Sequence, residues 1–156
     1  EALLLSPVDG IPEDPAAPGV VVKAQALALS GEGKFEEADP LWDEALGLIA
    51  EADGAKSAGS IKARVQHCES HLWPAGRQEE AIEKMKQVHV DAQEVFGEQD
   101  PKTVAMSKYV STYLQEAGQH EEAVVWRQIT LEGYHATLGS GHRGTMECAD
   151  ALADLL

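Results

Sequence analysis

The sequence predicts an all-α protein, a solenoid of helix hairpins stacked one on the next. A six-residue string with the pattern Gly-x-x-Glu-Glu-Ala occurs three times, at 33–38, 76–81 and 118–123. The glycines that open these strings are 43 and then 42 residues apart, and a second column of glycines keeps both spacings. The second column consists of Gly54, Gly97 and Gly139. Self-similarity at a fixed period indicates a repeat array, whose neighbouring units bury each other's apolar faces.

Residues 1–19 precede the first repeat and contain four of the seven prolines. Each proline fixes its φ angle, removes a backbone donor and biases the preceding residue away from helix, so we expect an extended arm. The arm is either a disordered linker or a segment held on a partner by Leu3, Leu4 and Leu5. Because the first residue is Glu1 rather than Met, we expect a processed product or a piece of a longer protein.

From residue 20 onwards, apolar residues recur at helical spacing between the glycines, as in Ile82, Met85 and Val88. Gly97 and Gly139 suit the left-handed position that follows a helix, and Asp100-Pro101 suits the cap and first turn of the next. The predicted first helices of the hairpins cover 20–31, 59–73, 102–117 and 144–156. The predicted second helices cover 35–52, 77–95 and 119–137. The repeats then span about 20–54, 55–97 and 98–139, with a partial fourth at 140–156.

The repeat unit resembles the tetratricopeptide repeat (TPR), in the long form found in kinesin light chains. The resemblance rests on the turn string, cleanest at 33–38, and on the alanine seven residues further on, Ala45. It also rests on the linker at 96–103, which is echoed at 138–145. It covers about 20–156 and implies a right-handed α-solenoid of three repeats plus the first helix of a fourth.

Some positions depart from the pattern of that family. The alanine is replaced by Val88 and Thr130 in the later copies, so we expect looser helix crossings there. Pro40 falls inside the second helix of repeat one, so either Asp39 caps a helix that starts at Pro40 or the helix kinks there. HEAT and armadillo arrays have similar periods, but nothing requires their patterns where the Gly-x-x-Glu-Glu-Ala turn is present.

The composition restricts the class of partner. Lys and Arg number 12 against 27 Asp and Glu, a formal net charge of −15, which repels phosphates and anionic lipids. We therefore expect protein partners, with neither nucleic acid nor membrane insertion. The two cysteines cannot form a disulfide framework, which favours a reducing compartment such as the cytoplasm, with a processed organellar protein as the alternative.

No residue pattern indicates catalysis, and we expect no catalytic residue, no metal and no cofactor. His67 and His71 lie four apart, a spacing that can bind a metal, but no third ligand is indicated. The repeat register places Cys68 level with Val110 on the packed face, so Cys68 is interpreted as a core residue. Cys68 and Cys148 lie on helices two repeats apart, too far for a disulfide, and are expected to be free thiols.

In the family that the chain resembles, the first helices line a concave groove that holds extended peptides or helices of partners. Carried over by register, the groove positions of this chain are Lys23, Leu27, Gln66, His67, Ser70, Trp73, Lys108, Tyr109, Thr112 and Asp150. The terminal-carboxylate clamp of the chaperone-binding members uses asparagines, and asparagine does not occur in this chain.

Two hypotheses of function follow. The first is a non-catalytic adaptor or scaffold whose groove binds a peptide or helix of a partner protein. The second is a structural subunit of a larger assembly, attached through the N-terminal leucines and through the apolar end of the last helix. The residues of that end are Leu152, Leu155 and Leu156.

Overall fold

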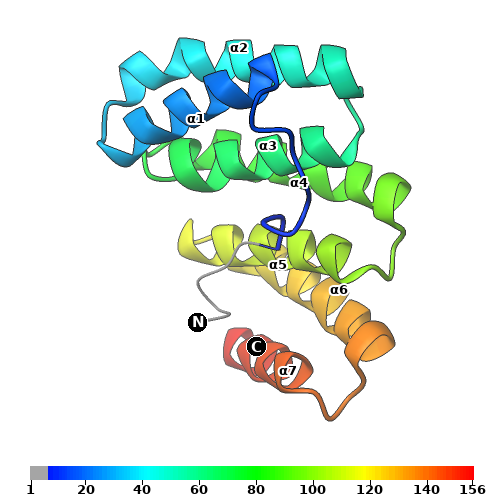
Figure 1. Cartoon of the computed structure of the whole chain (residues 1–156). Helices are drawn as coiled ribbons and strands as arrows, with labels where there is room; N and C mark the ends of the chain where they lie inside the picture. Colours follow the sequence, from blue (N-terminus) through cyan, green and yellow to red (C-terminus); the bar gives the residue numbers. More distant parts are fainter. Residues whose placement is uncertain (1–6) are drawn as a thin grey trace. The chain divides into compact units, whose positions relative to one another are not determined.

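The computed structural model describes residues 7–156, which form helices and no strand (Figure 1). In chain order the elements are α1 (Pro18–Gly31), α2 (Phe35–Asp53), α3 (Ala58–His67), η2 (Cys68–Leu72), α4 (Gln78–Phe96), α5 (Pro101–Glu116), α6 (His120–Leu138) and α7 (Arg143–Leu155). With η2 counted as the end of α3, each element lies within two residues of its predicted limits, so the predicted helices are confirmed. Between residues 7 and 156, no helix has the length and apolar character needed to cross a bilayer.

The glycine columns mark the turns between helices. All six of their glycines have positive φ, as the sequence predicts for Gly97 and Gly139. The detail differs from the predicted left-handed helical conformation, because Gly54 lies at φ 98°, ψ 147° and Gly139 at φ 84°, ψ 161°. This extended region with positive φ is essentially restricted to glycine. Glycine at these positions therefore lets the chain leave each second helix without strain.

The helices α3, α5 and α7 begin with side-chain caps, as expected for Asp100. The Asp100 carboxylate accepts a hydrogen bond from the backbone N–H of Lys102 at 2.8 Å, and Pro101 occupies the first turn. His142 takes the same position before α7, where its Nδ1 accepts from the N–H of Gly144 at 3.0 Å. Of the two alternatives for Pro40, a helix start capped by Asp39 is wrong, because α2 begins at Phe35 and runs through Pro40.

The chain divides into two compact units, one up to Lys84 and one from Met85 onwards. This division falls within α4, so the predicted limits of the repeats stay predictions. In the first unit α1 and α2 pack side by side and α3 packs against α2 (Figure 1). The centre of the hairpin is Ala26, Ala38 and Trp42, all fully buried. Burying an aromatic between two small residues lets the helices approach closely while it removes a large apolar area from water.

The turn η2 explains why the repeat spacing is 43 residues once and 42 the next time. Gly76 follows Gly54 by 22 residues, whereas Gly118 follows Gly97 by 21, so repeat two holds one extra residue between its glycines. The element between Gly54 and Gly76 is the one that ends in a π-turn, in which the N–H of Trp73 bonds to the carbonyl of Cys68 at 3.0 Å. A π-turn spans one more residue than an α-turn, so it absorbs the insertion without breaking the helix.

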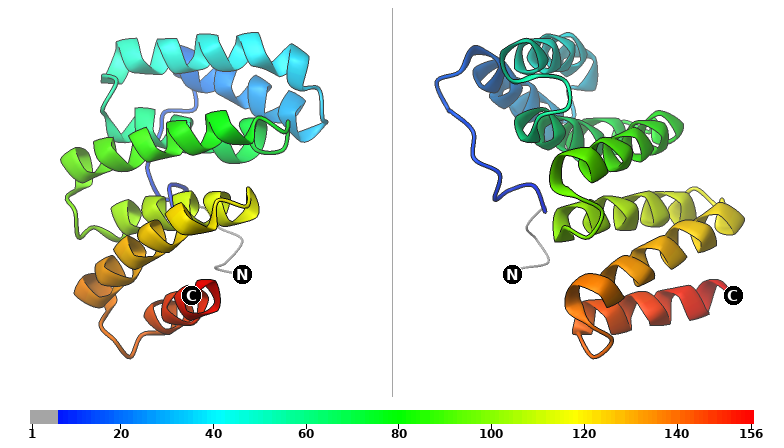
Figure 2. Two further views of the ribbon diagram at one scale, coloured as in Figure 1. Left: turned by 180° about the vertical axis from the view of Figure 1, so that it is seen from behind. Right: turned by 90° about the vertical axis from the view of Figure 1, so that its right-hand side faces the viewer.

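In the second unit α5 packs against α6, and α6 packs against α7 (Figure 2). The hydroxyls of Ser107 and Thr130 share a hydrogen bond of 2.8 Å across the first pair. Gly133 lets the backbone of α6 approach Val104, whose methyl carbons would lie 2.8 and 2.9 Å from an added Cβ. Thr130, where we expect a looser helix crossing, is fully buried, and the crossing itself stays a prediction.

One glycine inside α2 and one directly after it give a matched test of the turn geometry. Replacing Gly54 with Ala is expected to destabilise the protein by about 1–3 kcal/mol, because alanine is strained at its φ and ψ. Replacing Gly47, exposed inside α2 with open space around its Cβ position, is expected to stabilise by about 0.5–1 kcal/mol. Urea unfolding of both variants measures this. Equal changes of the same sign would contradict the assigned backbone.

Candidate functional site

The residues predicted to line a groove lie in both units, so the groove as a whole stays a prediction. Most have side chains at least partly accessible: Leu27, Gln66, Ser70, Trp73, Tyr109 and Thr112 are intermediate, and Lys108 and Asp150 are exposed. Two differ from the expectation, because Lys23 is 2% exposed and His67 is 4% exposed. At the chain end, Leu152 is buried and Leu156 is exposed, with Leu155 between them. Leu3, Leu4 and Leu5 lie outside the described residues.

The burial of His67 follows from the π-turn. The prediction used the 42-residue register, which places His67 level with Tyr109. That register holds only after the π-turn, whereas before the turn the spacing is 43 and His67 is level with Val110, a fully buried residue. After the turn the 42-residue spacing applies, and it places Cys68 level with Val110 as well. The consecutive residues His67 and Cys68 therefore both point into the core.

Lys23 is buried because residues 7–17, here called the arm, fold back onto α1 and α3. Val8 and Ile11 are buried, which neither alternative for the arm anticipated. The Lys23 ammonium forms an ion pair with Glu13, and Lys62 of α3 lies 3.5 Å from the other carboxylate oxygen of Glu13. The arm is therefore an ordered segment of the first unit between Pro7 and Ala17.

Lys62 also forms a hydrogen bond with the backbone of the arm. Its Nζ donates a hydrogen bond of 2.7 Å to the carbonyl oxygen of Ile11, and both lysines are buried. Partial burial alone would raise the pKa of Glu13, but the hydrogen bonds and charges of Lys23 and Lys62 outweigh it and lower that pKa. Two desolvated ammonium groups from the first helices of successive repeats thus share one carboxylate, an arrangement that requires an anion to be stable.

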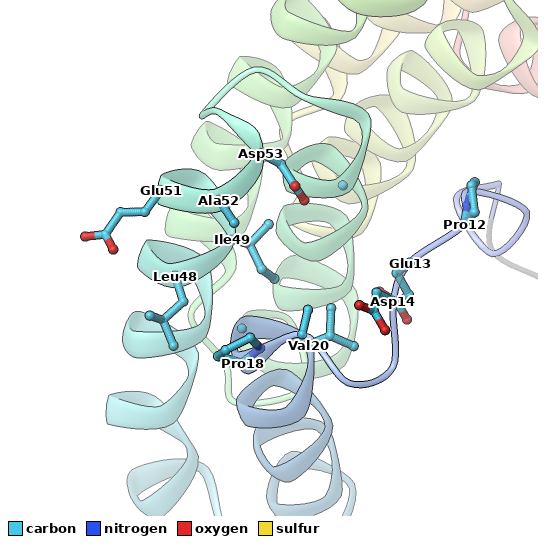
Figure 3. A pocket seen from close by; sticks show the side chains of 13 residues that line it. Pro12, Glu13, Asp14, Pro18, Val20, Leu48, Ile49, Glu51, Ala52 and Asp53 are labelled. Carbon is cyan, nitrogen blue, oxygen red and sulfur yellow. The ribbon is translucent and has the colours of Figure 1, made fainter.

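Beside this contact lies a pocket of about 580 Å³, between the arm, the start of α1 and the end of α2 (Figure 3). Pro12 and Glu13 of the arm form one side, and Leu48, Ile49 and Asp53 form the other. The pocket exists only while the arm is in place, because the arm supplies that side. It is therefore a consequence of the arm contact.

A buried polar network joins α1, α2 and η2. His71 is fully buried, with Nδ1 3.0 Å from the Ser30 hydroxyl and Nε2 2.7 Å from the Asp39 carboxylate. The same hydroxyl accepts from the indole N–H of Trp42 at 3.0 Å, and Arg77 donates to Asp39 at 2.6 Å. Satisfied networks of this kind are costly to break, because each member would leave buried partners without hydrogen bonds.

The contacts that lead from Ser30 through His71 to Asp39 have the arrangement of a hydrolase triad. The surroundings of these residues, however, give the arrangement a structural role. Ser30 is only 4% exposed, and its hydroxyl is oriented by both Trp42 and His71. A nucleophile must reach its substrate, and this one is enclosed between helices. Both ring nitrogens of His71 are engaged, so the pair His67 and His71 cannot chelate an ion as arranged. Over residues 7–156 no group of three or more potential ligands is arranged to hold a metal.

Two titratable groups beside the network, His67 and Cys68, are held neutral. His67 stacks on His71 with ring centroids 5.4 Å apart, and its Nε2 has no hydrogen-bond partner. Burial, with the positive charges of the neighbouring His71, Lys84 and Arg77, lowers the pKa of His67 to about 3. Burial also raises the pKa of Cys68 to about 12. Cys68 and Cys148 are both free thiols, as the sequence predicts, and both are buried.

Comparison with solved structures identifies the fold. A Podosopora anserina putative kinesin light chain with nearly identical TPR-like repeats matches at TM-score 0.69 and 19% identity, over 92% of this chain and 67% of that one. BtubC from P. vanneervenii matches at TM-score 0.69 and 18% identity, over 87% of this chain and 54% of that one. The chain is thus an all-α solenoid of TPR-like repeats. No family model and no curated protein matches it.

The network leads to a prediction on pH. Because the folded protein keeps His67 neutral while the unfolded chain takes up a proton near pH 6.5, stability is full above pH 6.5 and falls as the pH decreases towards 3. The His67 contribution to the slope is at most about 1.4 kcal/mol per pH unit. His67→Phe, which keeps a ring between Trp42 and His71, is expected to flatten the dependence between pH 6.5 and 4.5.

Urea unfolding of both proteins across that range measures the slopes. Part of the slope is expected to remain in the variant, since burial also lowers the pKa of His89. Identical slopes in the two proteins would show that His67 is protonated in the folded state.

Proposed function

We propose that the protein is a non-catalytic interaction module and that the first helices of repeats one and two bind an extended peptide of a protein partner. The observation that supports this is the arm, a segment of the chain itself that turns at 7–11 and contacts lysines of those helices. Its contacts with those helices are a backbone hydrogen bond from Lys62 and a carboxylate between Lys23 and Lys62. The side chains of Val8 and Ile11 in the arm are buried.

These contacts define the chemistry of the ligand. The lysine pair needs an anion, and the Ile11 carbonyl lies two residues before Glu13, so the favoured peptide carries an acidic residue two positions after a buried apolar one. A chain with a net charge of −15 would repel such a peptide at long range. Recognition therefore depends on short-range contacts with desolvated lysines, whose charge-assisted hydrogen bonds are stronger than those of exposed groups.

The arm makes the site self-occupied. A tethered segment competes with a free ligand at an effective concentration on the order of millimolar. A partner must therefore displace the arm, and its apparent affinity is lower than its affinity for the open site. This arrangement discriminates against short acidic peptides of low affinity.

A second candidate function, a structural subunit of a larger assembly, is favoured by a different observation. Met146 of α7 is 55% exposed, and Leu156, which directly follows α7, is 87% exposed. The arm, residues 7–17, does not support this second function, because it packs on its own chain.

The peptide site can be tested in the full-length chain by releasing the arm with Ile11→Asp and Glu13→Lys together. The probe is a fluorescent peptide with the sequence of residues 7–14. The released variant is expected to bind it at least about tenfold more tightly than the wild type does, because the wild-type arm occupies the site. Fluorescence anisotropy measures the affinity, and circular dichroism checks that the helices persist.

Two further substitutions serve as a matched pair in the released variant. Lys62→Met is expected to abolish probe binding, whereas Lys34→Met, at an exposed lysine on the loop before α2, leaves it unchanged. If the two substitutions weaken binding equally, or if release of the arm gives no gain, the proposed peptide site is wrong.

A further inference from the structure

The pocket beside the arm has walls of two kinds. Two walls are the start of α1 and the end of α2, which pack so tightly at Gly19 that a Cβ there would lie 2.7 Å from the Ile49 side chain. The other wall is the arm, which Lys23 and Lys62 hold in place. The pocket is therefore complete only when the arm is closed onto the first hairpin.

The lining combines an apolar floor with carboxylates. Figure 3 shows Ile49 and Val20 in the middle, with Asp53 of α2 to one side and Asp14 of the arm to the other. Of the 13 lining residues, four are acidic and none is basic. Glu13 is paired with lysines from outside the pocket, whereas no cation in the lining offsets Asp14 and Asp53.

The size and charge of the pocket define its ligand. A volume of about 580 Å³ suits a small organic molecule, and within residues 7–156 no group of three or more potential ligands is arranged for a metal. Carboxylates on two sides of an apolar floor favour a cation at each end of an apolar stem. The methylene groups of such a ligand contact Ile49 and Val20, and its ammonium groups pair with Asp14 and Asp53. An aliphatic diamine has this chemistry.

We propose that this pocket binds an aliphatic diamine and that the bound diamine holds the arm closed. Because the ligand contacts the arm on one side and α2 on the other, it binds the closed chain more tightly than the chain with the arm released. By linkage, it shifts the population towards the closed arm.

The diamine also regulates the peptide site, and this consequence alone rests on the proposed function. A peptide that must displace the arm competes with a ligand that holds the arm in place, so the diamine lowers the apparent affinity of the peptide. Binding of the diamine to the pocket needs only the observed contacts of the arm, and it is tested below without any peptide.

The probe is 1,5-diaminopentane, titrated calorimetrically into the full-length chain at constant ionic strength. Asp53→Asn and Glu51→Gln form a matched pair, because both residues are exposed in the last turn of α2 and each variant loses one negative charge. The Glu51 carboxylate points away from the pocket (Figure 3). Asp53→Asn is expected to weaken binding at least about fivefold, and Glu51→Gln to leave it within about twofold. Equal effects would show a general attraction of cations to an acidic chain and overturn the proposal.

A variant of the arm tests whether the arm completes the site. Val8→Asp together with Ile11→Asp places charges at two buried positions that do not line the pocket. The variant is more negative than the wild type, so a general attraction of cations would strengthen. Loss of the arm wall is instead expected to weaken binding at least about fivefold, with circular dichroism checking that the helices persist. Binding as tight as that of the wild type, or tighter, would overturn the proposal.

Hydrogen exchange tests whether the ligand holds the arm. The backbone N–H of Ile11 donates to the carbonyl oxygen of Val8 at 3.0 Å within the arm. At a diamine concentration ten times its Kd, exchange of this amide is expected to slow about tenfold, because the ligand binds only the closed arm. An unchanged rate at that concentration would show that the ligand does not bridge the arm, which overturns the proposal.

Two other cations test the chemistry of the ligand. Magnesium chloride supplies the same charge without an apolar stem, and N-acetyl-lysine amide supplies the stem with one ammonium group. Both are expected to bind at least about fivefold more weakly than the diamine. Equal binding of Mg²⁺ would indicate counterions only, and equal binding of the lysine derivative would indicate a lysine side chain of a partner protein. Either result overturns the proposal and leaves the peptide site, which has its own probe, unaffected.

Discussion

The contact on which the first unit depends is the hydrogen bonding of His71 to two different helices. Its two ring nitrogens bind Ser30 of α1 and Asp39 of α2, and it stands on the helix that α3 and η2 form together. Fixing that helix fixes Lys62, which lies nine residues before His71, beside Lys23 of α1. The two lysines that hold Glu13 are thus positioned by a network that does not touch Glu13 itself. Positioning of this kind lets two buried ammonium groups converge on one anion.

The single inserted residue of repeat two connects the sequence to this network. Before the π-turn the 43-residue register places His67 level with the buried Val110, and after the turn the 42-residue register places Cys68 level with the same residue. With the turn, His67, Cys68, His71 and Leu72 are all buried. The insertion therefore widens the buried face of one helix, and the two imidazoles that it brings inside are accommodated differently. His71 satisfies both nitrogens, whereas His67 is accommodated by staying neutral.

The sequence predicts the helices and turns well because they are set by local chemistry. Gly54 and Gly139 are required by their own φ and ψ, and Asp100 caps a helix two residues away. The site was predicted less completely, since its contacts join residues far apart in the chain. Ser30 and Asp39 had no visible partner in the sequence, and the burial of Lys23 depends on Glu13 of the arm. Lys62 could have been predicted as a groove residue from the sequence. It lies four residues, about one helical turn, before Gln66, which was predicted to line the groove.

The repeat geometry also explains why binding surfaces arise where they do. A first helix has one side that packs on its own second helix, as Val104 and Leu114 do, and another that carries polar residues such as Lys23 and Lys62. In the first unit α2 covers the packing side of α1, and the arm contacts the polar side through Lys23 and Lys62. On α7 the packing side is left open while its polar side carries Asp150 and Asp154. The two sides of a first helix therefore differ in chemistry, and in the first unit the polar side holds the Glu13 carboxylate between two buried lysines.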